Sequence, residues 1–284
     1  MTKSNKKMAV VGAGWLGAEI ARRAADAGFS AIATTRSGEW RAAGPHPDGV
    51  EVVGFDIVSD SASRLQSLLR DIDVAVFCYA PSGDQDRGRL YVEGAKSIAR
   101  ACSALPLERV IYTSSTSALS AHDGWIDETS EDWPENPRGR VQREAEAALR
   151  DGLSDSDTPW TLLRLAGLYG PGRELERIYR VRDPDLVRPG DGLEATNLIH
   201  LDDAAGAVLA AMGLPASDRG VIHVCDDDHR TRREVVAAIA AATGAPEPKW
   251  AEPADSRTAR GKRVVNTRMK ERLGLTLKHP THDL

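Results

Sequence analysis

Three glycines near the start of the chain have the spacing of a phosphate-binding loop. Gly12, Gly14 and Gly17 stand in the stretch VVGAGWLGAEI and match the pattern GxGxxG. An apolar run precedes them and a helical pattern follows, which is the context in which this pattern binds a dinucleotide. The first glycine permits a tight turn, the second lets the backbone approach a pyrophosphate, and the third lets the helix pack on the strand. We therefore predict a dinucleotide site that includes Trp15 and Leu16; the alternative is a glycine-rich turn that binds nothing.

The end of the next apolar run indicates which dinucleotide fits. An NAD-binding loop is usually followed, about 20 residues on, by an acidic side chain that binds the ribose hydroxyls. Here the corresponding stretch reads ATTRS, with Thr35 and Arg36 and no acid. A carboxylate would repel a 2′-phosphate, whereas an arginine binds it through charge-assisted hydrogen bonds. We predict NADP in preference to NAD, unless Arg36 is only a surface charge. Asp56, after the third apolar run, is expected to meet the adenine or to cap a turn.

Other candidate ligand contacts lie where later apolar runs end or begin. Tyr79 and Ala80 end the fourth run and are expected to line the cofactor cleft. Tyr169, in GLYGPGR, is placed by topology near the nicotinamide end, and Arg173 of the same motif could hold a substrate phosphate or carboxylate. Both also have a purely structural interpretation. Asn197, which precedes the stretch LIHLDD, is expected to contact substrate.

Strand and helix patterns alternate along the first half of the chain. These strands and helices must position the candidate ligand-binding residues. Apolar runs separated by helices predict a parallel sheet covered on both faces, so the fold class is a doubly wound α/β sheet. Thr231 and Glu234 form a capping-box signature before a further helix. The expected strands are 8–14, 30–35, 50–56, 73–80, 109–115, 160–170 and 220–226, and the expected helices are 15–28, 90–105 and 135–153. The stretch 198–212 is expected to begin as a strand and to continue as a helix.

The second half of the chain is less regular and predicts a smaller substrate lobe. Residues 1–167 are expected to form the dinucleotide-binding domain, to which 198–215 and a strand at 220–226 return. Residues 168–197 and 227–284 are expected to form the lobe, because 170–192 is rich in glycine, proline and charge.

Composition excludes several classes of protein. The 284 residues carry a net charge of −5, which argues against nucleic acid as the main partner. The three cysteines are widely spaced and include no CxxC pair, which predicts free thiols, and the acids of CDDD are not expected to bind metal. No signal peptide or membrane span is recognisable, so we expect a cytoplasmic protein that does not bind a membrane.

A series of motifs resembles one family almost from end to end. The stretches VVGAGWLG, ERVIYTSSTSAL, LLRLAGLYGPGR, NLIHLDDAAGAVLAAM and RVVNTRMKERLGL are similar to those of the extended and atypical short-chain dehydrogenase/reductases, the NAD-dependent epimerase/dehydratase family. GWLG, TSSTS and the GR near the active-site helix resemble its YeeZ-like subgroup. The resemblance implies a Rossmann fold and a nicotinamide cofactor. It does not fix the reaction, because one fold supports many chemistries.

The resemblance also implies where the catalytic groups should stand. In standard members a Ser or Thr polarises the substrate, a Tyr on the next helix passes the proton, and a Lys four residues later lowers the pKa of that Tyr. The serine matches Ser115, but the tyrosine and lysine positions hold Arg138 and Gln142, with Glu146 at the family's glutamate. Arginine stays protonated and is a poor general base. We expect Arg138, Gln142 and Glu146 to share one helix face toward the nicotinamide.

Three functions therefore remain open for the sequence. The first is an NADP-dependent oxidoreductase or epimerase-like enzyme acting on a polar small molecule, such as a sugar or sugar nucleotide. The second is a non-catalytic dinucleotide-binding sensor or scaffold, which the missing Tyr-Lys pair favours. The third is a lyase or isomerase in which the redox change of the cofactor is transient. The family also implies a homodimer.

Overall fold

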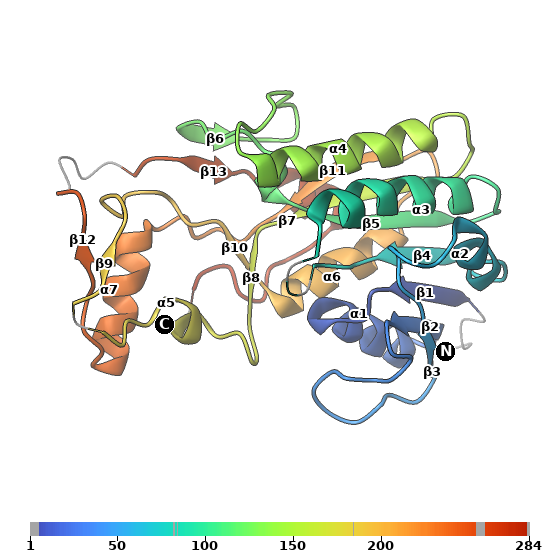
Figure 1. Cartoon of the computed structure of the whole chain (residues 1–284), viewed down its shortest axis with the longest axis horizontal. Helices are drawn as coiled ribbons and strands as arrows, with labels where there is room; N and C mark the ends of the chain where they lie inside the picture. The colour runs from blue at the N-terminus through green and yellow to red at the C-terminus, as the bar shows by residue number, and fades with distance from the viewer. Residues whose placement is uncertain (1–5, 82, 84, 184, 254–258, 283–284) are drawn as a thin grey trace.

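A parallel sheet of seven strands forms the centre of the computed structural model (Figure 1). The structure describes residues 6–81, 83, 85–183, 185–253 and 259–282. The strands lie in the order β11-β7-β5-β4-β1-β2-β3. The chain builds β2 and β3 on one side of β1 and then crosses to form β4 on the other side, so β1 lies between β4 and β2. Ligands bind at such a switch point, beyond the carboxyl ends of the strands. The strands are β1 Lys7–Val11, β2 Ser30–Thr35, β3 Val50–Gly54, β4 Val74–Phe77, β5 Arg109–Ser115, β7 Trp160–Leu165 and β11 Gly220–Val224.

Helices cover both faces of this sheet, which confirms the predicted doubly wound fold (Figure 1). Side chains of a strand alternate between faces, so β1 contributes to two separate cores. Met8 and Val10 pack on the face covered by α1 and α6, and Ala9 and Val11 on the other face. The helices of the first face are α1 Trp15–Asp26 and α6 Leu201–Met212, and those of the second are α2 Ala62–Leu68, α3 Gly94–Cys102 and α4 Pro137–Gly152.

Short elements form a lobe beside the carboxyl edge of the sheet, with α5 and α7 at its far side (Figure 1). Three strand pairs, all parallel, belong to this part: β8 with β10, β9 with β12, and β6 with β13. The predicted capping box is present, because Thr231 and Glu234 cap α7 reciprocally. The elements are β6 Gly124–Ile126, β8 Gly167–Tyr169, α5 Leu175–Tyr179, β9 Val187–Arg188, β10 Leu198–His200, α7 Arg232–Thr243, β12 Lys249–Trp250 and β13 Lys262–Val264.

Two expected elements differ in the structure. The single strand expected over 160–170 is wrong, because the chain leaves β7 after Leu165 and continues as β8, which pairs with β10 outside the main sheet. The expected helix over 90–105 begins as a π-helical turn, η1 Arg89–Glu93, before it becomes α3.

The chain after β13 forms a helix that the sequence analysis did not identify. This helix, α8 Thr267–Leu273, packs near α6 and β11, and its Met269 is fully buried in the main core. The division between domain and lobe at 168–197 and 227–284 stays a prediction. Within the described residues, no helix combines the length and apolar character that crossing a membrane requires.

Candidate functional site

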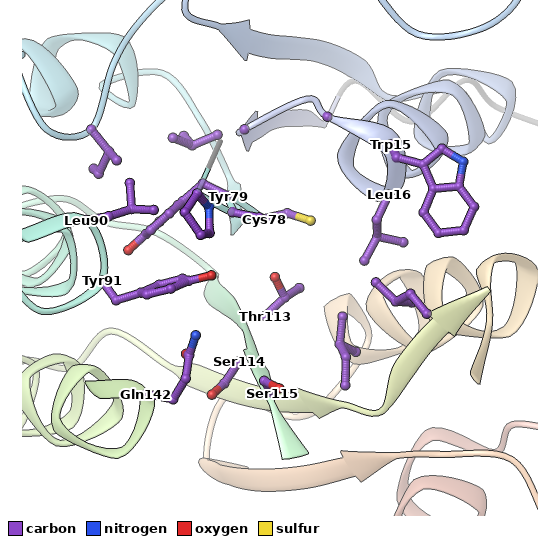
Figure 2. Close-up of a pocket in the computed structure, with 18 of the residues that line it drawn as sticks. Trp15, Leu16, Cys78, Tyr79, Leu90, Tyr91, Thr113, Ser114, Ser115 and Gln142 are labelled. Atoms are coloured by element: carbon purple, nitrogen blue, oxygen red, sulfur yellow. The ribbon is translucent and has the colours of Figure 1, made fainter. Parts of the chain in front are cut away.

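A cavity of about 950 Å³ opens along the carboxyl ends of β1, β2, β4 and β5. Its walls come from the loop after β1, the ends of the strands, η1, α4, the segment after β7 and Lys262. Figure 2 shows Trp15 and Leu16 at one side of this cavity and Gln142 at the other. Most residues predicted for the site meet here: Gly12, Gly14, Trp15, Leu16, Thr35, Arg36, Asp56, Tyr79, Ala80, Ser115, Arg138, Gln142 and Arg173 all line it.

The glycine loop has the geometry that its spacing predicts. Gly12 has a φ of 98°, and a Cβ there would stand 2.5 Å from the carbonyl oxygen of Cys78. A Cβ on Gly17 would overlap the carbonyl oxygen of Gly12, so this glycine lets α1 pack beneath the loop and does not itself line the cavity. A Cβ on Gly14 would meet nothing within 4 Å. Gly14 therefore presents bare backbone to the cavity at the start of α1, where helix N–H groups favour an anion.

The end of β2 supplies positive charge to the same wall. The backbone N–H of Gly12 donates to Thr34 Oγ1 at 3.1 Å, which ties the loop to the strand. Arg36 is exposed at the cavity rim, and Arg41, from the loop after β2, also lines the cavity and forms an ion pair with Glu39. Asp56 lines the cavity and also caps a turn, because its Oδ1 accepts from the backbone N–H of Val58 at 2.8 Å.

Trp15 joins the glycine loop to the segment after β7. Its indole N–H donates to the carbonyl oxygen of Pro171 at 3.0 Å. The guanidinium of Arg173 lies 4.6 Å from the centroid of the indole ring, a cation–π contact. Trp15 therefore fixes Arg173 at the cavity wall, a role that the glycine spacing alone does not indicate.

The turn after β5 and the start of α4 are held tightly together. Ser115 Oγ accepts from the backbone N–H of Ser117 at 3.1 Å and so caps the turn Thr116–Ala118. A side chain at Gly139 would overlap the carbonyl oxygen of Ser117, so only glycine lets α4 approach this turn. Asn136 caps α4, because its Oδ1 accepts from the backbone N–H of Gly139 ahead of Pro137, the first residue of the helix.

Lys262, which the sequence analysis did not single out, reaches the same turn from β13. Its Nζ donates to the carbonyl oxygens of Thr116 at 2.8 Å and Leu119 at 3.1 Å. Burial lowers the pKa of Lys262 to about 8. Ser115, Arg138, Arg173 and Lys262 thus place one hydroxyl and three cationic groups around the cavity wall.

Helix α4 brings two of its three expected residues to the cavity. Arg138 and Gln142 line it, but Glu146 does not, so the expectation that all three residues face the nicotinamide site is wrong for Glu146. Glu146 is buried against β7, where the guanidinium of Arg164 donates to both carboxylate oxygens. Ser114 Oγ donates to Glu146 Oε1 at 2.6 Å, and burial raises the pKa of Glu146 to about 7.

Two predicted ligand contacts do not reach the cavity. Tyr169 is buried in the lobe core, where its ring meets those of His200 and His282 edge-on at 5.2 and 5.7 Å. Asn197 uses both ends of its amide for β13: Nδ2 donates to the carbonyl oxygen of Lys262 at 2.9 Å, and Oδ1 accepts from the N–H of Val264 at 2.8 Å. Both residues hold the lobe together in this structure, because their polar or aromatic surfaces are directed into it.

One cluster outside the cavity has metal-ligand residue types. His200, Asp202 and His279 offer ligand atoms within 4.8 Å of one another. His200 Nδ1 already accepts from the N–H of Asp202 and caps α6, and Arg23 forms an ion pair with Asp202. These contacts use the groups that a cation would need, and the cluster ties α1, α6 and the chain end together.

Several residues of the cavity wall were missed because their sequence context indicates only core. Tyr91 stands in an apolar helical pattern, and Thr113 and Ser114 lie inside a strand. Lys262 comes from a tail whose structure the sequence does not predict. The basic cluster RGKR that contains it is typical of a solvated face and gave no signal of a cavity.

Comparison with known proteins supports the presence of a dinucleotide-binding fold. A model of a family described as NAD(P)H-binding matches residues 12–213. Protein YeeZ of Escherichia coli (strain K12) is 27% identical over 286 residues, which cover 97% of each chain. This chain is also similar to the solved structure of a putative NAD-dependent epimerase/dehydratase from Methylobacillus flagellatus, with 27% identity, a TM-score of 0.74 and coverage of 98% and 95%.

A more distant solved structure shows the same fold. MoeE5 in complex with UDP-glucuronic acid and NAD is 22% identical, with a TM-score of 0.77 and coverage of 96% of this chain and 94% of the other. The family match, the full-length similarity to YeeZ and the shared fold confirm the family expected from the motifs. The chain belongs to the NAD(P)H-binding family and has the fold of the NAD-dependent epimerases and dehydratases.

Proposed function

We propose that this protein is an NADP-dependent oxidoreductase or epimerase-like enzyme that acts on a polar, anionic small molecule without the Tyr-Lys relay of its relatives. The observation that carries the proposal is the continuity of the cavity. One space joins the bare backbone of Gly14 to the Ser115 turn, and cations line both parts of it. A protein that only stored a dinucleotide would need the first part alone.

The residues of the first part fit a phosphorylated dinucleotide. The loop around Gly14 offers backbone N–H groups and the N-terminus of α1 to a pyrophosphate. Arg36 and Arg41 at the end of β2 favour NADP, because each can bind a 2′-phosphate that an acid would repel. When bound, the nicotinamide supplies hydride transfer. NAD is the less favoured alternative.

The residues of the second part fit an anionic substrate. Arg138 forms no ion pair among the residues that the structure describes, so its charge is available to a ligand. Arg173 is held at the wall by Trp15, and Lys262 is held by two carbonyl oxygens. Ser115 keeps its hydroxyl proton for a substrate oxygen, because its Oγ acts as the acceptor in the bond to Ser117. MoeE5, which binds UDP-glucuronic acid, makes sugar nucleotides the first class to test.

A non-catalytic dinucleotide sensor is the second candidate. One observation favours it: Arg138 and Gln142, at the positions where the resemblance implies the proton-relay tyrosine and its lysine, both line the cavity. Arginine cannot exchange a proton near neutral pH, so proton transfer needs another group. A sensor predicts tight NADP binding with no ligand in the second part of the cavity.

Calorimetric titration of the purified chain separates the two candidates. NADPH should bind, and UDP-glucuronate should then bind to the NADPH complex but more weakly to Arg138→Ala, because it loses a cation partner. In a turnover screen, Ser115→Ala should cost more activity than Gln142→Ala, since the serine contacts the substrate directly and the glutamine acts only through another residue. Ser67→Ala, exposed on α2, is the matched control. NADPH binding with no second ligand among sugar nucleotides and other anions would support the sensor.

A further inference from the structure

Tyr91 lies on a π-helical turn of the cavity wall. It is the central residue of the π-helical turn Arg89–Glu93, and only 7% of its surface is exposed. Such turns are rare and occur often at functional sites. Tyr91 lines the cavity, and Figure 2 shows its hydroxyl directed into the space between Tyr79 and Gln142.

The ring of Tyr91 is fixed by its neighbours, whereas its hydroxyl is not committed to the core. The rings of Tyr91 and Tyr79 stack with centroids 5.9 Å apart, and Tyr79 in turn meets Tyr112 edge-on at 5.9 Å. The hydroxyls of Tyr79 and Tyr112 lie 3.4 Å apart, within hydrogen-bond reach of each other. Tyr91 is therefore the member of this stack whose hydroxyl faces the cavity.

Gln142, at the family's lysine position, contacts that hydroxyl. Figure 2 shows the amide nitrogen of Gln142 directed toward the hydroxyl of Tyr91, an arrangement in which the amide can donate to that hydroxyl and lowers its pKa. Gln142 is buried, with only 5% of its surface exposed, yet its amide oxygen has no hydrogen-bond partner among the described residues. An unpaired buried acceptor costs about 1 to 3 kcal/mol. A donor on a bound ligand, such as a hydroxyl, would satisfy it.

The surroundings of Tyr91 keep its hydroxyl protonated. Burial raises its pKa, which the Gln142 bond and the charges of Arg87 and Arg138 partly oppose, and Cys78 adds to the rise. A neutral tyrosine next to two cations can donate a proton, because the phenolate that forms is stabilised by the same bond and charges. Arg138 thus acts on the proton carrier without carrying the proton.

We propose that Tyr91 is the proton-transfer residue of this site and that Gln142 is the residue that positions it. A bound reduced nicotinamide would supply hydride to a substrate carbonyl carbon. The Tyr91 hydroxyl gives its proton to the carbonyl oxygen, and water reprotonates the phenolate. In the oxidation direction the proton returns by the same route. This role rests on the proposed function, and it moves the missing tyrosine from α4 to η1.

The absorbance of ionised tyrosine tests the role without a known substrate. Subtracting the alkaline titration of Tyr91→Phe from that of the wild type isolates one hydroxyl. Adding NADP⁺ should shift the midpoint of that difference to lower pH, because the oxidised nicotinamide is cationic. Gln142→Leu should shift it to higher pH, since the stabilising bond is lost. Tyr112→Phe, a buried neighbour outside the cavity wall, should retain the response to NADP⁺.

Binding and turnover complete the test. Tyr91→Phe should bind NADPH within about twofold of the wild type, and with a turned-over substrate kcat should fall about 100-fold or more while KM changes little. If NADP⁺ binds the wild type but the isolated titration does not respond, the Tyr91 role is wrong while the proposed function stands. If NADP(H) does not bind the wild type, the proposed function fails, and this role fails with it.

Discussion

Successive turns of helix α4 present polar side chains to two different surroundings. Arg138 and Gln142 face the cavity, and the amide oxygen of Gln142 has no protein partner among the described residues. One turn further on, Glu146 is enclosed by Arg164 and Ser114, with both carboxylate oxygens bonded. A polar residue that the fold satisfies holds elements together, whereas one left unsatisfied at a cavity wall is available to a ligand. The sequence spacing is the same in both cases, so only the packing distinguishes the two roles.

The largest expected change in unfolding free energy is for the turn of α4 that carries Glu146, whose carboxylate is fully hydrogen-bonded. Glu146→Gln leaves the guanidinium of Arg164 buried without a carboxylate, and breaking a buried pair costs about 3 to 5 kcal/mol of unfolding free energy. Arg138→Gln, at the cavity, should change it by less than about 0.5 kcal/mol. Urea unfolding at pH 8, where Glu146 is ionised, measures both. Equal costs for the two variants would contradict the distinction.

Two glycines of the loop after β1 also differ in role: Gly17 is required for packing, whereas Gly14 presents its backbone to the cavity. Gly17→Ala should reduce stability by about 1 to 3 kcal/mol, because the added methyl overlaps the carbonyl oxygen of Gly12. Gly14→Val should leave the unfolding free energy almost unchanged, since a Cβ there meets open space, but should weaken NADPH binding at least about 100-fold, or about 2.7 kcal/mol. Calorimetry and thermal unfolding separate the two effects. If Gly14→Val binds NADPH normally, the loop is not the cofactor site.

Arg36 is expected to set the preference for NADPH over NADH in the cofactor part of the cavity. Arg36→Ala should remove most of the preference for NADPH over NADH, because a charge-assisted contact to phosphate is worth about 1.5 to 3 kcal/mol. Titrations with both dinucleotides give the ratio of affinities. Arg64→Ala, which removes an exposed ion pair outside the cavity, is the matched control. An unchanged ratio in Arg36→Ala would assign the preference to Arg41 or would show that none exists.

The fold was predictable because its signals are local, whereas the site was only partly so. Alternating apolar runs and the glycine spacing specify the sheet and its loop, since both depend on near neighbours in the chain. The wall of the cavity combines Tyr91, Gln142 and Lys262, which lie far apart in the sequence. No periodicity indicates such an encounter. Tyr169 and Asn197 failed for the same reason, because the direction of a side chain at a strand end depends on which strand it pairs with.

The break after Leu165 shows this dependence most clearly. The stretch 160–170 is largely apolar and predicts one strand, yet β7 pairs with β5 and β11 while β8 pairs with β10. Tyr169 therefore enters the lobe core instead of following the sheet edge to the cavity. A strand that changes partners redirects every residue after the change.

The smallest expected effect concerns Lys262, whose charge depends on pH. Burial lowers its pKa from 10.5 to about 8, so the side chain is cationic below pH 8 and loses its charge as pH rises through that value. The affinity of the NADPH complex for UDP-glucuronate should therefore fall a few-fold between pH 7 and 9. Lys262→Arg stays charged and should remove this decline, whereas Lys249→Arg, exposed on β12, should not.

The same lysine makes an independent prediction for stability. Between about pH 8 and 10.5 the unfolded chain binds the proton that folded Lys262 has released, so this group makes stability rise with pH in that window. Below pH 8 both states are protonated and its contribution is constant. Lys262→Met, which never binds a proton, should remove this part of the slope in denaturant unfolding measured across the window. If the wild type and Lys262→Met have the same slope, Lys262 titrates normally, and the decline in ligand affinity must then come from another group at the cavity.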